Sequence, residues 1–174
     1  MVNDDELWFY YAAFAGDETL TNTGSCVTSG NYSNGATGLA KLRRDGFASM
    51  DGTGTLTTEK VAFSGKYLYV NANASGGSLK AELLDANGKV IEGYSVNDCV
   101  ALTEDSTKTK LSFGEGKDLS AFAGKGVKLR FYLENAELYS FWVTGDGENG
   151  ASNGYLAAGS VGQKGLIDTK ESYK

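Results

Sequence analysis

The chain has 174 residues, of which 41% are hydrophobic, and its formal net charge is −6. This length predicts one domain with a sizeable core. The acidic balance argues against nucleic acid and anionic lipid as partners, because both require a basic protein face. Histidine is absent, which excludes histidine bases, histidine-activated nucleophiles and histidine metal ligands. Carboxylates can still catalyse, as in glycosidases, but no spacing singles out a pair among the 22 acidic residues, so catalysis by this chain alone is not expected.

The first predicted element is a strand at residues 6–14, with the sequence ELWFYYAAF. It is apolar or aromatic on both alternating faces, which predicts a strand covered on both sides. We therefore expect residues 1–14 to be an entry strand, buried either in this chain or against a partner. A long loop of Gly, Ser, Thr and Asn is predicted to follow at residues 15–37.

Two adjacent arginines come next, in the stretch GLAKLRRDGFASMDG. Arg43 and Arg44 fall on opposite faces of a predicted strand, just before a turn expected at Asp45-Gly46. A functional interpretation is recognition of an acidic sugar such as a uronate. The structural interpretation, which we prefer, is that an arginine holds the strand end by bidentate hydrogen bonds to a carboxylate or to loop carbonyls.

The rest of the chain reads as short strands separated by turn signals. A hairpin at 78–95 is predicted to close at Asn87-Gly88, and a second hairpin is predicted at 127–144. One helical turn is expected at 118–125, capped by Asp118 or Ser120 and ended by Gly124. Further strands are predicted within 53–63, 66–74 and 107–113, and a loop-like tail at 145–174.

Together these elements predict an all-β fold with antiparallel strands. We expect a β-sandwich, jelly-roll-like, with long glycine-rich loops and at most one short helical turn. The predicted organisation is a single domain over residues 1–174, whose sandwich body spans 38–144. Crossover helices are missing from the pattern, which excludes a βαβ architecture.

The order of several motifs adds a resemblance over about residues 38–160. The motifs are LRRDGFASMDG, GTLTT, YLYVNANASGGSLKAELLDANGKVIEGYSVNDC, GKGVKLRFYLENAELYSFWV and NGASNGYLAAG. In this order they resemble the C-terminal β-sandwich module of five-bladed β-propeller glycoside hydrolases and related bacterial proteins. The resemblance implies an accessory, non-catalytic role, because the catalytic carboxylates of that group lie on the propeller.

Aromatic and amide side chains are the candidates for carbohydrate binding. Sugar rings stack on flat aromatic rings, and exposed aromatics are the usual means by which sandwich modules bind sugars. The candidates lie in a loop of small residues, on one face of the strand at 66–74, and on the polar face of the strand at 127–134. They are Tyr32, Tyr67, Tyr69, Asn71 and Tyr132. The alternative for these rings, and for Trp8 and Trp142, is packing in the core or on a sheet face.

Other side chains suggest a metal site and a disulfide. Asp146 and Glu148, in the segment TGDGEN, are weak calcium candidates through side-chain and carbonyl oxygens, although a solvated loop is the simpler interpretation. No other cofactor is expected. Cys26 and Cys99 match no metal spacing, so they are either isolated thiols or a disulfide that fastens the first loop to the body.

These observations lead to two hypotheses of function. The first is a non-catalytic β-sandwich accessory module, with a catalytic propeller domain and a polysaccharide or oligosaccharide as partners. The second is a self-associating extracellular structural protein, such as a surface-layer or filament subunit, since a strand with two apolar faces is a template for association. Either fits an extracellular or cell-surface location. We expect no signal peptide in the N-terminal residues and no membrane insertion.

Overall fold

The computed structural model describes residues 1–17, 32–150 and 156–158, the last only in its backbone. The chain divides into two compact units, Met1–Arg44 and Asp45–Lys174. The predicted organisation was a single domain whose body begins at residue 38. The structure differs because the strand after the first loop pairs with the entry strand and not with the sandwich. We describe each unit by itself.

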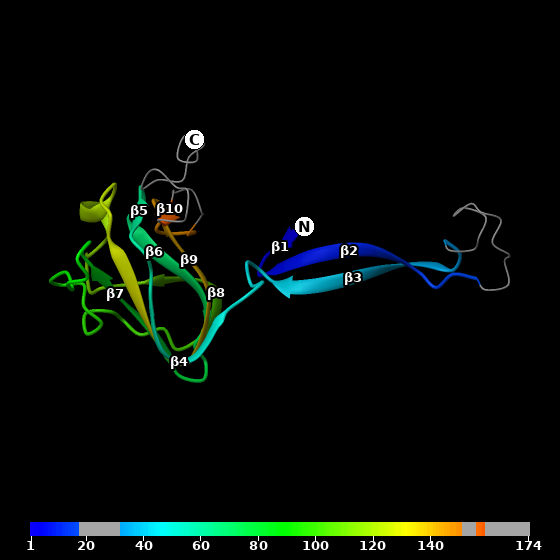
Figure 1. Ribbon diagram of the computed structural model, residues 1–174, viewed down its shortest axis with the longest axis horizontal. Helices are drawn as coiled ribbons and strands as arrows, with labels where there is room; N and C mark the ends of the chain where they lie inside the picture. Colours follow the sequence, from blue (N-terminus) through cyan, green and yellow to red (C-terminus); the bar gives the residue numbers. More distant parts are fainter. Residues whose placement is uncertain (18–31, 151–155, 159–174) are drawn as a thin grey trace. The chain divides into compact units, whose positions relative to one another are not determined.

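The first unit is one antiparallel sheet in the order β1–β2–β3. Its strands are β1 (Val2–Asn3), β2 (Glu6–Phe14) and β3 (Gly35–Arg43). β2 and β3 pair along their whole length, as Figure 1 shows. Strand β3 begins at Gly35, two residues before the predicted end of the loop at residue 37. Glycines of β3 accommodate rings of β2 at two cross-strand pairs, since Gly35 lies against Phe14 and Gly38 against Tyr11.

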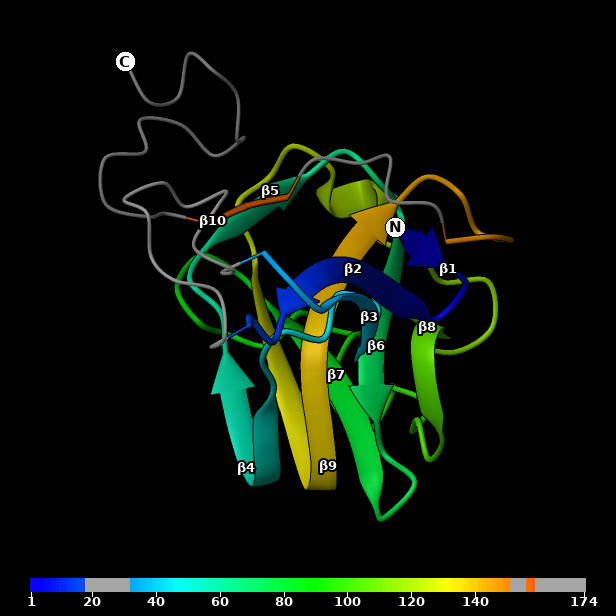
Figure 2. The ribbon, with the colours of Figure 1, turned by 90° about the vertical axis from the view of Figure 1, so that its right-hand side faces the viewer.

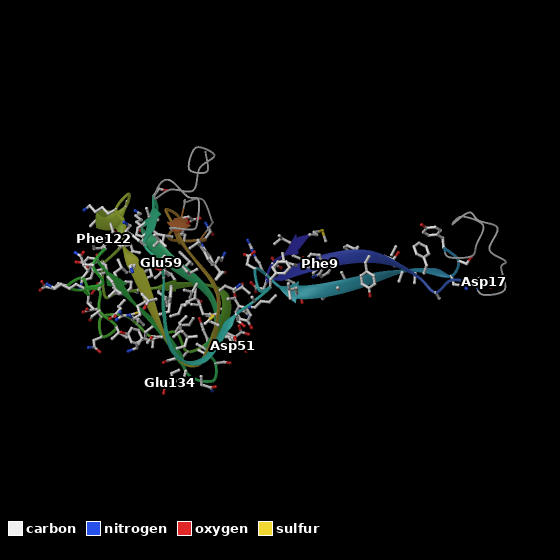
Figure 3. All side chains as sticks on the ribbon, viewed as in Figure 1. Phe9, Asp17, Asp51, Glu59, Phe122 and Glu134 are labelled. Carbon is white, nitrogen blue, oxygen red and sulfur yellow. The ribbon has the colours of Figure 1, made fainter. Side chains whose placement is uncertain are left out.

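The described residues of the first unit do not bury the entry strand on either face. Phe9 is 44% exposed and Tyr10, on the opposite face of β2, is 59% exposed. Figure 3 shows the side chains of this sheet, Phe9 among them, standing off the ribbon. No described residue of the first unit is buried. The single sheet of this unit supplies only one layer, so it cannot cover its own faces. Burial of β2 against a partner stays a prediction.

The second unit is a β-sandwich-like fold built around one long strand. The main sheet has the order β4–β9–β6–β8, and β7 also pairs with β9 (Figure 2). A second, two-stranded sheet joins β5 to β10. The strands are β4 (Met50–Thr57), β5 (Val61–Phe63), β6 (Tyr67–Asn73), β7 (Ser78–Leu84), β8 (Asp105–Leu111), β9 (Lys128–Thr144) and β10 (Leu156–Ala158).

The segment 127–144 is a single strand, β9, and not the hairpin predicted from the sequence. Asn135 takes a left-handed backbone conformation, with φ of 43°. The residues around it form a bulge at which the strand bends, and the two halves do not pair with each other as those of a hairpin would. Ala136, directly after Asn135, is buried. The first half of β9 pairs with β7 and the second half with β6. The alternation of apolar residues in each half is correct, but the turn between them is not.

The core of the second unit combines residues from both halves of β9 with residues of the neighbouring strands. Its largest fully buried side chains are Phe63, Phe131, Leu68, Leu79, Leu83, Leu84, Leu119, Leu129, Val61, Val70, Val143 and Asn71. The alternating positions of β7 and of the first half of β9 face inward, as the pattern predicted. The core cluster draws on residues 61–143 alone, so every member lies in the second unit.

The predicted helical turn is present as a 3-10 helix, Ser120–Phe122, but its N-cap residue is Leu119 and not Asp118 or Ser120. Asp118 accepts hydrogen bonds from the Ser120 backbone and hydroxyl, and Gly124, with φ of 73°, ends the turn. Gly88, with φ of 86°, lies in the turn after β7, as predicted. The described residues 89–95 after this turn form no second strand, and an isolated β-bridge joins Leu84 to Val90. Of the predicted loop-like tail, Leu156–Ala158 pairs with β5, and the positions around it lie outside the described residues.

The prediction of an all-β, antiparallel fold with one short helical turn is confirmed. The jelly-roll connectivity stays a prediction. In the part of the chain that the structure describes, no helix has the length and apolar character needed to cross a membrane.

Candidate functional site

Three of the carbohydrate-binding candidates, Tyr67, Tyr69 and Asn71, alternate along strand β6 and so share one face of it. Only one of the three is exposed to solvent to a useful extent. Tyr69 is 4% exposed and Asn71 is 1% exposed, whereas Tyr67 is partly exposed. A ring that stacks on a sugar must offer one open face. The structure therefore makes Tyr69 and Asn71 parts of the packing and leaves Tyr67, whose ring lies against Gly147 but is partly exposed, as the β6 residue that can contact a ligand.

Tyr69 is buried because a loop of the second unit folds over it. Its hydroxyl donates to the Gly147 carbonyl at 2.9 Å, and its ring stacks on Trp142 with 5.8 Å between centroids. The Trp142 indole N–H donates to the Gly150 carbonyl at 2.9 Å. Burial, with Asp146 and Tyr67 as lesser causes, raises the pKa of the Tyr69 hydroxyl above its usual value. The packing interpretation thus holds for Tyr69 and Trp142.

Tyr67 lines a pocket of about 280 Å³ where the start of β6 meets the end of β8. Two lysine ammonium groups lie near its ring, Lys66 at 5.1 Å and Lys110 at 5.2 Å from the centroid. Both distances are within the range of cation–π attraction. The pocket is lined by Lys66, Tyr67, Leu68, Lys110, Leu111, Ser112, Phe113, Gly114, Glu115, Gly116, Lys117 and Asp118.

Three further polar groups of this pocket have partners within the protein. The Ser112 hydroxyl donates to the Gly114 carbonyl at 3.2 Å. Lys117 donates to the Gly93 carbonyl at 3.0 Å. The pKa of the Asp118 carboxyl is lowered, chiefly by hydrogen bonds from Ser120 and more weakly by the charge of Lys66. The pocket thus combines an aromatic ring, ammonium groups and a hydroxyl, which suits a polar ligand with a charged substituent.

Tyr132 lies on the outer face of β9, where its hydroxyl is engaged in a hydrogen bond to a buried carboxylate. Its hydroxyl donates to Glu82 Oε1 at 2.8 Å, and Arg130 donates to the same oxygen at 2.9 Å. The Val96 backbone N–H donates to Glu82 Oε2 at 3.3 Å. Glu82 is 3% exposed, so these donors satisfy a charge that would otherwise be costly to bury. The arrangement links β7 to β9.

The first unit carries three of the predicted site residues, Tyr32, Arg43 and Arg44. Tyr32 is 58% exposed, and its ring meets Phe14 edge to face at 5.3 Å between centroids. Arg44 donates its backbone N–H to the Asp5 carbonyl at 2.8 Å, and its guanidinium donates to the Asp4 carbonyl at 3.3 Å. Arg43 is the register partner of Glu6. These contacts favour the structural interpretation of the two arginines.

The calcium candidates form a backbone turn. Asp146 Oδ1 accepts hydrogen bonds from the backbone N–H groups of Glu148 and Asn149, at 3.0 and 2.9 Å. Glu148 itself is exposed. Among the described residues, no group of three or more carboxylate or thiol ligands is arranged to hold a metal ion. Calcium binding at Asp146 and Glu148 stays a prediction.

Cys99 is buried in the core of the second unit. The Ala81 backbone N–H donates to its sulfur at 3.3 Å, and burial raises the pKa of the thiol. Cys26 lies outside the described residues, so the disulfide also stays a prediction.

The lysines of the Tyr67 pocket were not singled out from the sequence. Lys66 directly precedes Tyr67, but Lys110 and Lys117 reach the site only because β8 pairs antiparallel with β6, with Leu111 opposite Leu68. Before that register is known, scattered lysines in an acidic chain carry no distinguishing signal.

Comparisons with protein-family models, with curated proteins and with solved structures give no match to this chain.

Proposed function

We propose that this chain is a non-catalytic β-sandwich accessory module of a glycoside-hydrolase-type protein, and that it binds carbohydrate in the Tyr67 pocket. The observation that carries the proposal is the pocket itself. It places a partly exposed ring beside ammonium groups and the Ser112 hydroxyl, on a unit that has its own core. Aromatic surface with a few polar groups is the composition of a sugar site.

Two further points support the accessory role. The order of motifs over residues 38–160 resembles the sandwich modules of propeller glycoside hydrolases. The first unit presents aromatic side chains on both faces of one sheet, and such surface gains free energy when a neighbouring domain covers it. The proposal includes the extracellular or cell-surface location typical of proteins that act on polysaccharides.

Calorimetry or affinity electrophoresis of the full chain, with a panel of plant, algal and microbial glycans, tests the binding. We expect at least one glycan to bind and Tyr67→Leu to weaken that binding about tenfold, the loss expected for one stacked ring. Lys108→Ala is the matched control, because Lys108 is exposed on β8 and does not line the pocket. Failure of every glycan to bind would overturn the carbohydrate-binding role.

The exposed faces of β2 favour a second candidate function, that of a self-associating structural protein. In this case another copy of the chain would cover the aromatic residues of the first unit. Size-exclusion chromatography with light scattering separates the two candidates. Discrete or open-ended oligomers that dissociate when Tyr10 and Phe9 are replaced by serine would support self-association, and a monomer at high concentration would exclude it.

A further inference from the structure

The Tyr67 pocket concentrates positive charge in a protein whose formal net charge is −6. Lys66, Lys110 and Lys117 all line it, together with the acidic Glu115 and Asp118. The ammonium groups of Lys66 and Lys110 both lie about 5 Å from the centre of one ring. Two ammonium groups beside one ring make the local potential more positive, which favours a ligand with a negative charge.

Within the part of the chain that the structure describes, no ion pair neutralises the charge of these two lysines. The described residues include the ion pairs Lys41–Glu6 and Arg130–Glu82, and neither Lys66 nor Lys110 takes part in an ion pair with a described residue. Asp118, whose carboxyl pKa is lowered in part by the charge of Lys66, already accepts two hydrogen bonds from Ser120. Lys117 is held at the pocket rim by the Gly93 carbonyl. Two ammonium groups are therefore available to a ligand.

The Tyr67 ring also limits the freedom of these lysines. Cation–π attraction holds each ammonium near the ring before a ligand arrives, which reduces the entropy lost when the ligand binds. The loop Gly114–Gly116 borders the same pocket and exposes backbone groups to it. A small pocket with preorganised ammonium groups beside an aromatic ring matches a sugar that carries an anionic substituent.

We propose that the Tyr67 pocket is selective for acidic glycans, with Lys66 and Lys110 binding the carboxylate or sulfate group of one sugar unit. This inference rests on the proposed carbohydrate-binding function and names the ligand class of that same site. It assigns Lys110 a direct contact with the anionic group.

Calorimetry on the full chain compares matched glycan pairs that differ only in charge. One pair is oligogalacturonate and its methyl ester, which tests a carboxylate, and the other is a sulfated galactan and its desulfated form, which tests a sulfate ester. Inorganic sulfate is a third arm, because it tests the anion site without a sugar. Lys110→Gln is the test variant and Lys108→Gln the control on the same strand, and melting temperatures verify that both remain folded.

We expect one charged glycan to bind at least tenfold more tightly than its neutral partner. Lys110→Gln should lower that affinity roughly fivefold, and higher salt should weaken it, because exposed charges are screened. Equal binding of charged and neutral partners would overturn the acidic selectivity and leave carbohydrate binding standing. Binding of inorganic sulfate with no glycan would overturn the carbohydrate function but not the anion site. Unchanged affinity in Lys110→Gln would overturn the role of Lys110.

Discussion

The rings of Phe131 and Phe141 lie 5.0 Å apart, although both belong to strand β9. Ten residues of straight strand span about 33 Å, so β9 must bend strongly between them. The bend coincides with the bulge at Asn135, whose N–H donates to Thr53 Oγ1 at 2.9 Å. One strand thus contributes to both parts of the sandwich and brings its own two halves together in the core.

Replacement of Asn135 tests this bend. Asn135 has φ of 43° and its side chain donates to the Gly76 carbonyl at 2.8 Å. We expect Asn135→Ala to lower the free energy of unfolding by about 2 kcal/mol, through the strained backbone and the lost hydrogen bond. Asn135→Gly is the control, because glycine adopts positive φ without strain, and it should lose less than half as much. Equal losses in urea denaturation would show that the backbone conformation is not the cause.

The backbone of Gly77, just before β7, lies so close to Glu134 of β9 that we expect no larger residue to be tolerated there. A Cβ added at Gly77 would overlap the carbonyl oxygen of Glu134, whereas one added at Gly54 meets nothing within 4 Å. We expect Gly77→Ala to destabilise the second unit by about 3 kcal/mol and Gly54→Ala to be neutral or slightly stabilising. Thermal unfolding of both variants measures the contrast, and similar melting temperatures would contradict the close packing.

The low pKa of Asp118 predicts a pH-dependent contribution to stability. The carboxylate that accepts from Ser120 is favoured in the folded state, so its stabilisation is present above about pH 4 and is lost as the pH falls through the lowered value. Asp118→Asn should therefore be less stable than the parent at pH 7 and approach it near pH 3. Melting temperatures from pH 7 to pH 3 test this, and a constant difference would exclude the linkage.

Burial of Cys99 predicts slow reaction of its thiol. Burial raises the pKa of the thiol and so lowers the fraction of reactive thiolate. In a Cys26→Ser variant, we expect iodoacetamide to label Cys99 at least a hundredfold more slowly in the folded protein than in urea. Mass spectrometry follows the rate. Labelling of the parent protein in urea without reductant would show in addition whether Cys99 is free, since a disulfide to Cys26 would block it.

Removal of the first unit should leave the second unit folded. The core cluster draws only on residues 61–143, and residues 1–17 and 32–44 contain no buried side chain. We expect a chain of residues 45–174 to unfold cooperatively, with a melting temperature within a few degrees of the parent transition. An insoluble or unfolded product would show that the entry strand is integral, as the pattern of residues 6–14 first indicated.

The sequence by itself determined the local elements whose signal lies within a few residues. The alternation of apolar residues identified β6, β7 and both halves of β9, and the segment from Asp118 to Gly124 identified the helical turn, although not its N-cap residue. These features depend on side-chain period and on glycine conformation, which neighbouring residues decide. The all-β, antiparallel class follows from them.

Only the tertiary structure decided how these elements combine and which side chains reach the surface. Asn135 is compatible with a turn or a bulge, and the pairing of β9 with both β7 and β6 selects the bulge. Tyr67 and Tyr69 share one face of β6, yet the loop over Tyr69 buries it and leaves Tyr67 open. Lys110 joins Tyr67 only through the register of β8. Contacts between residues far apart in the chain depend on packing, which local periodicity does not encode.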